Sequence, residues 1–293
     1  MIFIGGPTAS GKTAAAVQLA LALKAPVLSA DARQVFKEMR IGTARPEAQE
    51  LHSVPHYLLG HRSIHEPYDA ARFEEEALAL LEKLFPHHSE VIVVGGSGLY
   101  MKALANGLDQ MPEVDHEIRI QIQRELNQSG LTSLVEELKM KDPVFAQQAD
   151  LNNPRRVQRA IEVIRSTGKP YSEFRRGKTV RRDFDMVWIG LDPPRPLLYD
   201  RIHQRVDRMI REGLMEEVIS LYPFRHLQAL HTVGYTELFE VIDGKTSMDE
   251  AINGIKQNTR RYAKRQLTWF RRQHELHWQS EFDLADCLRL IKA

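Results

Sequence analysis

The chain has 293 residues, 43% of them hydrophobic, and a formal net charge of +1, which is enough apolar content for an ordinary buried core in one large domain or two smaller ones. No apolar run approaches the roughly 20 residues that cross a bilayer, and the first predicted strand runs straight into a glycine-rich loop, leaving no room for a signal peptide. The single cysteine, Cys287, has no partner for a disulfide or a cysteine zinc site. We therefore expect a cytoplasmic protein without a membrane segment.

The first predicted elements are an apolar strand over residues 1–5, a glycine-rich loop and an alanine-rich helix over 13–24. The loop fits the pattern GxxxxGK[ST], with the residues Gly6, Pro7, Thr8, Ala9, Ser10, Gly11, Lys12 and Thr13. In such a loop, backbone N–H groups point at phosphate oxygens, the lysine reaches a phosphate and the last hydroxyl is a ligand of Mg²⁺. We predict a phosphate cradle with Mg²⁺ on Thr13. A turn that binds nothing is the alternative, and the motif does not identify the bond that breaks.

A second predicted strand, residues 26–30, ends at Asp31. Ligands of open parallel sheets lie beyond the carboxyl ends of the strands, so the topology brings Asp31 beside the loop. A carboxylate there can hold Mg²⁺ through water or accept a proton from a nucleophile, and it could equally cap a following helix. Gln34 has the donors and the acceptor to read a base edge, which by itself is a weak indication.

The alternation of strands and helices continues with a short strand over 54–60, a helix over 69–85 and a buried strand over 90–94. The glycine-rich turn that follows contains Ser97, whose hydroxyl could support a phosphate or an acceptor atom, although a tight turn without a ligand would have the same residues. This alternation predicts an α/β fold, a parallel sheet of the P-loop NTPase type flanked by helices.

Strand signals disappear after about residue 112, where amphipathic helices follow one another over 117–128, 131–141 and 153–166. We predict a helical insertion domain over 112–185 within an α/β core made of 1–111 and 186–293. The core resumes with a strand over 186–191. The remaining elements are predicted helices over 195–212, 214–221, 237–242 and 247–274, a short strand over 277–278 and a helix over 284–291.

Three basic stretches, at 155–159, 175–182 and 256–272, are separated in the sequence. In the last stretch Tyr262, Trp269 and Phe270 interleave with the cations, a combination that binds a phosphate backbone and stacks an unpaired base. Part of that stretch must pack in a core, yet three patches favour a nucleic-acid partner. Arg205 lies on a further basic helix and could stabilise a leaving phosphate, or belong to a solvated helix face.

With these motifs placed, the chain resembles the tRNA dimethylallyltransferases, the IPP transferase family, over nearly its whole length. The most specific shared motifs are SADARQ at 29–34 and YAKRQLTWFR at 262–271. Further shared motifs are IGTARP at 41–46, VPHYL at 54–58, VGGSGLY at 94–100, NPRRVQRAIEV at 153–163, RVDRMIREGL at 205–214 and TVGYTEL at 232–238. Ala32 departs from the family, which usually has serine or cysteine there.

The resemblance implies transfer of a dimethylallyl group from dimethylallyl diphosphate to the N6 amine of the adenosine adjacent to the anticodon in tRNA, with release of pyrophosphate. It implies that Asp31 is the general base and that Lys12, Thr13, Ser97 and Arg205 hold the pyrophosphate and its Mg²⁺. A monomer suffices for this chemistry. The positions that the resemblance assigns to tRNA contact are Asp31, Ala32, Arg33, Gln34, Ser97, Arg119, Arg155, Arg156, Val157, Gln158, Arg159, His231, Thr232, Val233, Gly234, Tyr235, Thr236, Lys264, Arg265, Gln266, Thr268, Trp269 and Arg271.

Two other functions share some of these features. A small P-loop kinase, binding ATP, would use the same cradle, Mg²⁺ and aspartate, but it gives the basic and aromatic stretch near the C-terminus nothing to do. A non-catalytic RNA-binding or nucleotide-sensing module would leave Asp31 dispensable.

Overall fold

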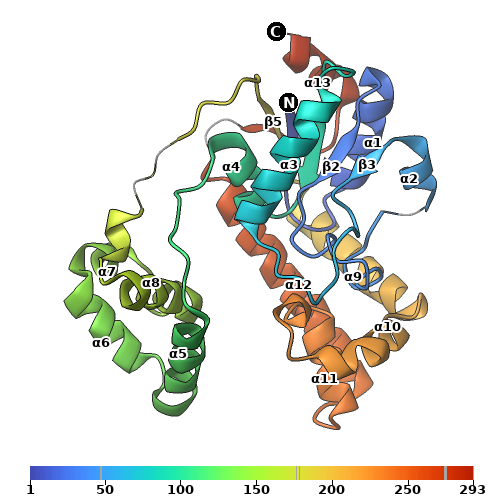
Figure 1. The fold of residues 1–293 in the computed structure, drawn as a ribbon. Coiled ribbons are helices and arrows are strands. Elements are labelled where there is room, and N and C mark those ends of the chain that lie inside the picture. The colour runs from blue at the N-terminus through green and yellow to red at the C-terminus, as the bar shows by residue number, and fades with distance from the viewer. Residues whose placement is uncertain (47, 176, 178, 274–275, 293) are drawn as a thin grey trace. The chain divides into compact units, whose positions relative to one another are not determined.

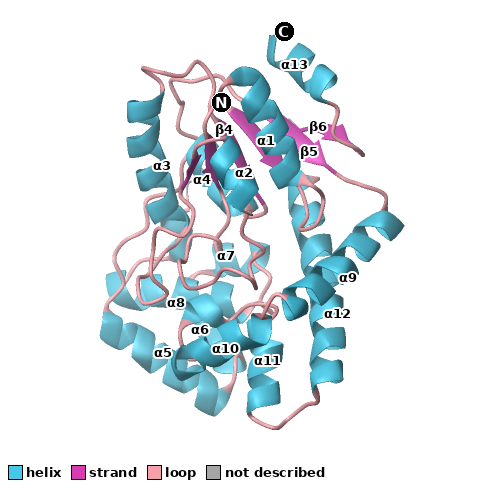
Figure 2. Cartoon of the chain, turned by 90° about the vertical axis from the view of Figure 1, so that its right-hand side faces the viewer, coloured by secondary structure: helices cyan, strands magenta, loops and turns pink. Residues whose placement is uncertain are grey.

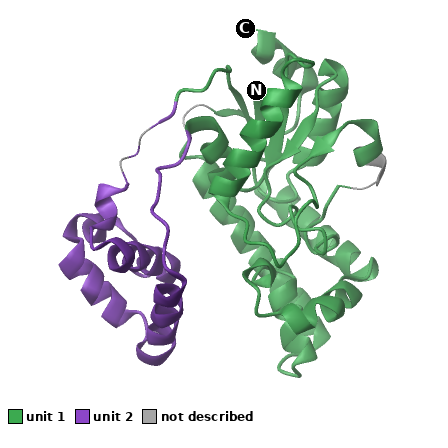
Figure 3. Ribbon diagram, in the orientation of Figure 1, with its two compact units in different colours: residues 1–106, 181–293 green, residues 107–180 purple. Residues whose placement is uncertain are grey.

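The computed structural model describes residues 1–293 except 47, 176, 178, 274–275 and 293. The chain divides into two compact units, residues 1–106 with 181–293, and residues 107–180 (Figure 3). The predicted domain boundaries, 112 and 185, lie a few residues beyond those of the second unit. Arg176 and Lys178 of the middle basic stretch, and the predicted helix end at His274, lie outside the described residues.

Unit 1 is built on a six-stranded sheet in the order β3-β2-β4-β1-β5-β6, and every paired strand is parallel (Figure 1). Its strands are β1 (Ile2–Gly5), β2 (Val27–Ser29), β3 (His56–Tyr57), β4 (Ile92–Gly95), β5 (Val187–Leu191) and β6 (Leu276–Gln279). The predicted α/β parallel sheet is confirmed. Gly5 pairs with Gly95 on one side and Gly190 on the other, so the three central strands end level with one another. The loops that follow them therefore start from the same edge of the sheet.

Helices cover both faces of this sheet and extend beyond its edge (Figure 2). They are α1 (Lys12–Leu23), α2 (Ala48–Ser53), α3 (Ala70–Leu84), α4 (Gly98–Asn106), α9 (Arg195–Arg211), α10 (Leu214–Leu221), α11 (Tyr235–Ile242), α12 (Met248–Phe270) and α13 (Leu284–Lys292), with 3-10 turns η2 (Tyr222–Phe224) and η3 (Gln228–Leu230). The short helices α2 and α4 are not predicted from the sequence. Helix α4 begins inside a glycine turn, so its start has the residues of a loop. Helix α12 starts at a capping box of Ser247 and Glu250.

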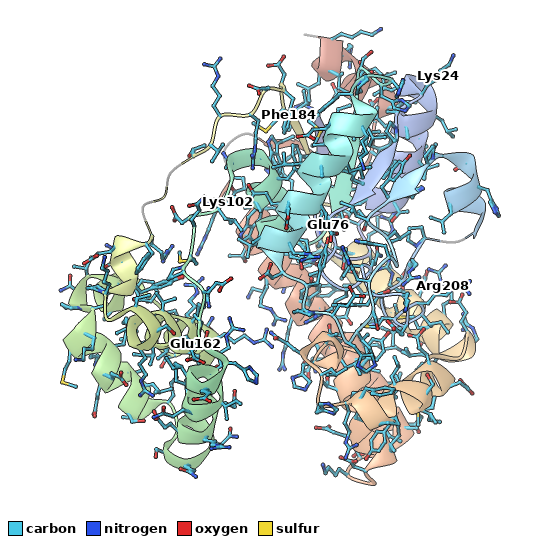
Figure 4. The ribbon with its side chains drawn as sticks, viewed as in Figure 1. Lys24, Glu76, Lys102, Glu162, Phe184 and Arg208 are labelled. Atoms are coloured by element: carbon cyan, nitrogen blue, oxygen red, sulfur yellow. The ribbon has the colours of Figure 1, made fainter. Side chains whose placement is uncertain are left out.

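One apolar core lies on the sheet and contains Ile4 and Leu19. A second apolar core lies among α9 to α12 and contains Val35, Phe36 and Met39 from the chain after β2. The segment after β3 is tied to α3 by Glu76, which accepts hydrogen bonds from His61 at 2.8 Å and Tyr68 at 2.9 Å and from Arg62 (Figure 4). The connections beyond the sheet edge are thus anchored by the apolar core among α9 to α12 and by Glu76 of α3.

Among the described residues, none of the helices has the length and apolar character that crossing a membrane requires.

Unit 2 is a small helical body of α5 (His116–Ser129), α6 (Thr132–Lys141), α7 (Pro143–Gln148), α8 (Pro154–Thr167) and the 3-10 turn η1 (Tyr171–Glu173). Fully buried apolar residues, among them Ile122, Leu138 and Val157, form its core. Arg165 of α8 reaches carboxylates on two other helices, Glu125 at 2.8 Å and Glu137 at 2.5 Å. Its core and its ion pairs come from its own helices, so the unit holds itself together.

Candidate active site

The loop of residues 6–13 has the strand–loop–helix context that its motif requires. It leaves β1 at Gly6, where an added Cβ would lie 2.6 Å from the carbonyl oxygen of Leu191. It enters α1 at Gly11, whose φ of 91° is a left-handed conformation that favours glycine. Both motif glycines are therefore required by the backbone, one by close approach and one by its dihedral angle.

Lys12 is half-buried, and its Nζ is enclosed by this loop, where it donates to the carbonyl oxygen of Pro7 at 2.5 Å. Burial, and next the positive charge of Arg205, lower the pKa of Lys12 to about 7, while Asp31 acts in the opposite direction. The hydroxyl of Ser10 is buried and has no hydrogen-bond partner among the described residues. An enclosed cation and an unsatisfied hydroxyl in one loop make up a cradle that gains from an anionic ligand.

Asp31 follows β2, as predicted, and its carboxylate is held in place by its own backbone. Oδ1 accepts hydrogen bonds from the N–H groups of Arg33, at 2.9 Å, and Gln34, at 3.3 Å. The residues after Asp31 form turns rather than a helix, so Asp31 caps a turn and not a helix. The hydroxyl of Ser97 accepts the N–H of Ala32 at 2.9 Å, which fixes the same turn from β4.

Gln34 has its amide fully engaged within the protein. Its Nε2 donates to the carbonyl oxygens of Thr43 and Ala44, both at 3.1 Å, and its Oε1 accepts from the hydroxyl of Ser29 at 3.3 Å. The interpretation of Gln34 as a reader of a base edge is not needed to explain these contacts. The side chain holds the segment 43–44 against the end of β2.

Helices α9 and α12 hold the phosphate loop from the C-terminal half of the chain. Arg205 donates to the hydroxyl of Thr8 at 2.7 Å, and Gln266 accepts the N–H of Thr8 at 2.8 Å. Gln266 also donates to the carbonyl oxygen of Gly96 at 3.0 Å. An added Cβ at Gly96 would lie 2.1 Å from Gln266 Nε2, and one at Gly98 would lie 2.1 Å from the indole of Trp269. The glycine turn after β4 is therefore shaped by α12.

One cavity of about 990 Å³ joins these groups. Its polar lining includes residues 8–14, Asp31 and Arg205, and its apolar lining includes Val206, Met209, Val233, Ile255 and Tyr262. Segment 40–46 and His56 line it as well, whereas Ser97 does not. The structure thus brings the predicted cradle, the predicted base and the predicted arginine to a single space that also offers room for an apolar group.

Comparison with known proteins identifies the family. A family model described as IPP transferase matches residues 34–273. The chain belongs to the IPP transferase family. It is 48% identical over 283 residues to the tRNA dimethylallyltransferase of Christiangramia forsetii, covering 97% of this chain and 93% of that protein. It is also 48% identical over 293 residues to that of Cytophaga hutchinsonii, covering 100% and 96%.

Solved structures agree with this assignment. This IPP transferase aligns with the tRNA isopentenylpyrophosphate transferase of Bacillus halodurans at a TM-score of 0.70 and 36% identity, covering 99% of this chain and 93% of that one. A eukaryotic dimethylallyltransferase that acts on tRNA aligns at a TM-score of 0.80 and 26% identity, covering 100% of this chain and 76% of that one. The chain is an enzyme of this family, and the resemblance that its sequence motifs indicate is confirmed.

The positions predicted to contact tRNA lie in both units of this IPP transferase and differ in exposure. Lys264, Arg265 and Thr268 are exposed on α12, and Arg271 pairs with Asp192 at 2.5 Å. In unit 2, Arg155 and Arg156 are exposed, while Arg119 and Arg159 lie 3.9 and 3.4 Å from Glu162 of α8 (Figure 4).

Other predicted contact positions are buried or line the cavity. The side chains of Val157, Tyr235 and Gln266 are buried, and Gln266 also lines the cavity. Thr232, Val233 and Gly234 line the cavity. His231 and Thr236, which are close to them in the sequence, do not line it. Gln158 is half-buried and donates to Gln123 at 3.1 Å.

Sequence reasoning missed Glu217 of α10, which supports one wall of the cavity. Its carboxylate accepts the backbone N–H groups of Arg40, Ile41 and Gly42 at 2.9, 2.8 and 3.0 Å. It also accepts the hydroxyl of fully buried Tyr235 at 2.6 Å. No sequence signal marks it, because a glutamate on an amphipathic helix usually faces solvent.

Proposed function

We propose that this IPP transferase moves a dimethylallyl group from dimethylallyl diphosphate to the N6 amine of the adenosine adjacent to the anticodon of tRNA, releasing pyrophosphate. The observation that carries the proposal is the single cavity in which a phosphate cradle, a fixed carboxylate and an apolar wall meet. The names of the similar proteins, tRNA dimethylallyltransferases, support the same reaction and the same acceptor.

The cradle is suited to stabilise the leaving group. As the bond between the allylic carbon and the diphosphate oxygen breaks, negative charge grows on that oxygen. Lys12, Arg205 and the residues at the start of α1 line the cavity, and their cations and backbone N–H groups are suited to stabilise this charge. Diphosphate therefore leaves as an anion already held by cations, and no phosphoryl group is transferred.

Asp31 is suited to act as the general base. Both of its backbone hydrogen bonds go to Oδ1, so the carboxylate keeps its orientation and Oδ2 has the capacity to accept a proton. The N6 amine of adenine is a weak nucleophile, and removing its proton as the C–N bond forms avoids a cationic product. The adenine must leave its stack to reach a cavity of this kind, as bases do in other enzymes that modify them.

The oxygen donors that line the cavity fit Mg²⁺. Thr13 and Asp31 both line it, and Mg²⁺ prefers hydroxyl, carboxylate and phosphate oxygens. Bound there with the donor, the ion would neutralise part of the diphosphate charge. The binding residues would be Thr13 directly and Asp31 through water.

The test is direct. Purified protein is incubated with Mg²⁺, dimethylallyl diphosphate and unmodified tRNA, and the nucleosides are analysed by mass spectrometry. We expect isopentenyladenosine and one equivalent of pyrophosphate. Absence of product with a competent tRNA, together with hydrolysis of ATP or transfer of its γ-phosphate, would establish the kinase alternative instead.

A further inference from the structure

A second hollow lies outside the phosphate loop, along helix α9. This open groove has a volume of about 660 Å³, and four arginines of α9 line it: Arg201, Arg205, Arg208 and Arg211. Their spacings of four, three and three residues put them on one face of the helix. The row extends about 15 Å along the helix axis, given the rise of roughly 1.5 Å per residue. Figure 4 marks Arg208 on this helix.

The groove is strongly positive. Arg201 and Arg211 are exposed at its two ends. Among the acids near it, Asp207 pairs with Lys256 at 2.6 Å, Glu212 lies 3.8 Å from Arg208, and Asp200 accepts a hydrogen bond from Gln204 at 2.8 Å. The lining of the groove therefore carries four arginines against one acid, Asp207, whose charge Lys256 offsets.

The groove is also continuous with the cradle. Ala9, Gly11, Arg205 and Arg208 line both hollows. An anion that enters along α9 therefore arrives at the outer side of the phosphate loop, with Arg205 shared between the two positions. A row of arginines that shares its lining with a phosphate cradle fits a small, multiply charged anion better than it fits a polynucleotide backbone, whose charges are spread along an extended chain.

From this geometry we infer that the α9 groove is a capture site for the diphosphate group. The inference rests on the proposed function: the donor's diphosphate is held there before it enters the loop, and inorganic diphosphate leaves by the same route. The row of arginines acts by long-range attraction, so its contribution belongs to the rate of capture and weakens with salt.

The test is the double variant Arg201→Gln/Arg211→Gln, which leaves Arg205 and the phosphate loop unchanged. Donor kinetics are measured at saturating tRNA. We expect kcat/KM for dimethylallyl diphosphate to fall about 3- to 10-fold at an ionic strength of about 0.03 M, and by less than about 2-fold at about 0.5 M, with kcat unchanged. Lys83→Gln/Lys292→Gln, which removes the same charge from α3 and α13, should behave as the wild type.

Binding of inorganic diphosphate, followed by calorimetry, tests the site without turnover and should weaken in the groove variant in parallel. An unchanged kcat/KM at low salt, or an equal loss in the control variant, would overturn the inference. A loss confined to the donor, with inorganic diphosphate unaffected, would show that the groove does not read the diphosphate. A loss of tRNA affinity alone would assign the groove to RNA. If the wild type makes no product, the proposed reaction fails, while the calorimetry still decides the groove.

Discussion

We expect Lys12 to change its charge when diphosphate binds. In the free protein its pKa is about 7, because burial and Arg205 disfavour the ammonium form. A bound diphosphate favours that form and raises the pKa. Above pH 7, binding must therefore take up a proton, and we predict that affinity for diphosphate falls by up to about tenfold per pH unit between pH 7 and 9. Below about pH 6, Lys12 is charged in both states and contributes no pH dependence. Calorimetry in two buffers of different ionisation enthalpy measures the proton uptake.

The matched control is Lys12→Arg, whose side chain keeps its charge throughout this range. It removes the proton uptake of Lys12 and leaves only the titration of the diphosphate itself. Equal proton uptake in the two proteins would show that Lys12 is already charged when free.

In the free wild type the same lowered pKa of Lys12 means that the unfolded chain binds more protons than the native one above pH 7. Lys12 should therefore make the protein more stable as pH rises from about 7 towards 10.

For Asp31, the informative substitution is asparagine. The asparagine side chain keeps an oxygen for the hydrogen bonds from Arg33 and Gln34, so the turn is preserved, but it cannot accept the amine proton. We predict that Asp31→Asn lowers the prenylation rate by about 10² to 10⁴ and leaves tRNA affinity within about 3-fold. Single-turnover kinetics and filter binding measure the two effects. A variant with full activity would remove Asp31 from the role of base.

Segment 40–46 is held in place by one carboxylate of helix α10, that of Glu217. We predict that Glu217→Gln lowers the free energy of unfolding by about 1–3 kcal/mol, since one carboxylate accepts four hydrogen bonds there. Because the displaced segment is a wall of the cavity, KM should rise several-fold while kcat changes less. Urea unfolding and steady-state kinetics measure these changes.

The neighbouring Glu216→Gln is the control, because Glu216 is exposed on the same helix. If both variants retain wild-type KM, segment 40–46 does not depend on Glu217 for its position.

The elements themselves were largely predictable, whereas their mutual support was not. Buried parallel strands such as β1 and β4 are continuous apolar runs, and α3 and α12 begin at side-chain caps, so these signals are local. Glu217 and Gln266 support the cavity through contacts between segments distant in the sequence, whereas Gln34 does so within residues 29–44. The residue types of all three indicate only polarity. The assignment of Gln266 to tRNA contact stays a prediction; in the structure its side chain is buried and bonds to Thr8 and Gly96.

The exposed cations of the two units predict how tRNA binding responds to salt. Each phosphate contact releases counterions, so the slope of log affinity against log salt should be steep, and removing two contacts should reduce it by about 1.5 to 2. We predict this for Arg155→Gln/Arg156→Gln in unit 2 and for Lys264→Gln/Arg265→Gln on α12. Binding measured over a range of salt concentrations decides it, and a slope unchanged in either pair would exclude that surface.

Gln266 has a consequence for biosynthesis. It bonds to Thr8 across 258 residues of chain and to Gly96 across 170. Once β5 has left the ribosome, the phosphate loop and all the described strands but β6 have left it too. Helix α12, which carries Gln266, has not yet emerged. Until α12 leaves the exit tunnel, the nascent protein lacks the hydrogen bonds of Gln266 to the phosphate loop and to the turn after β4. We therefore expect a chain that terminates before α12 to bind diphosphate more weakly than the full chain.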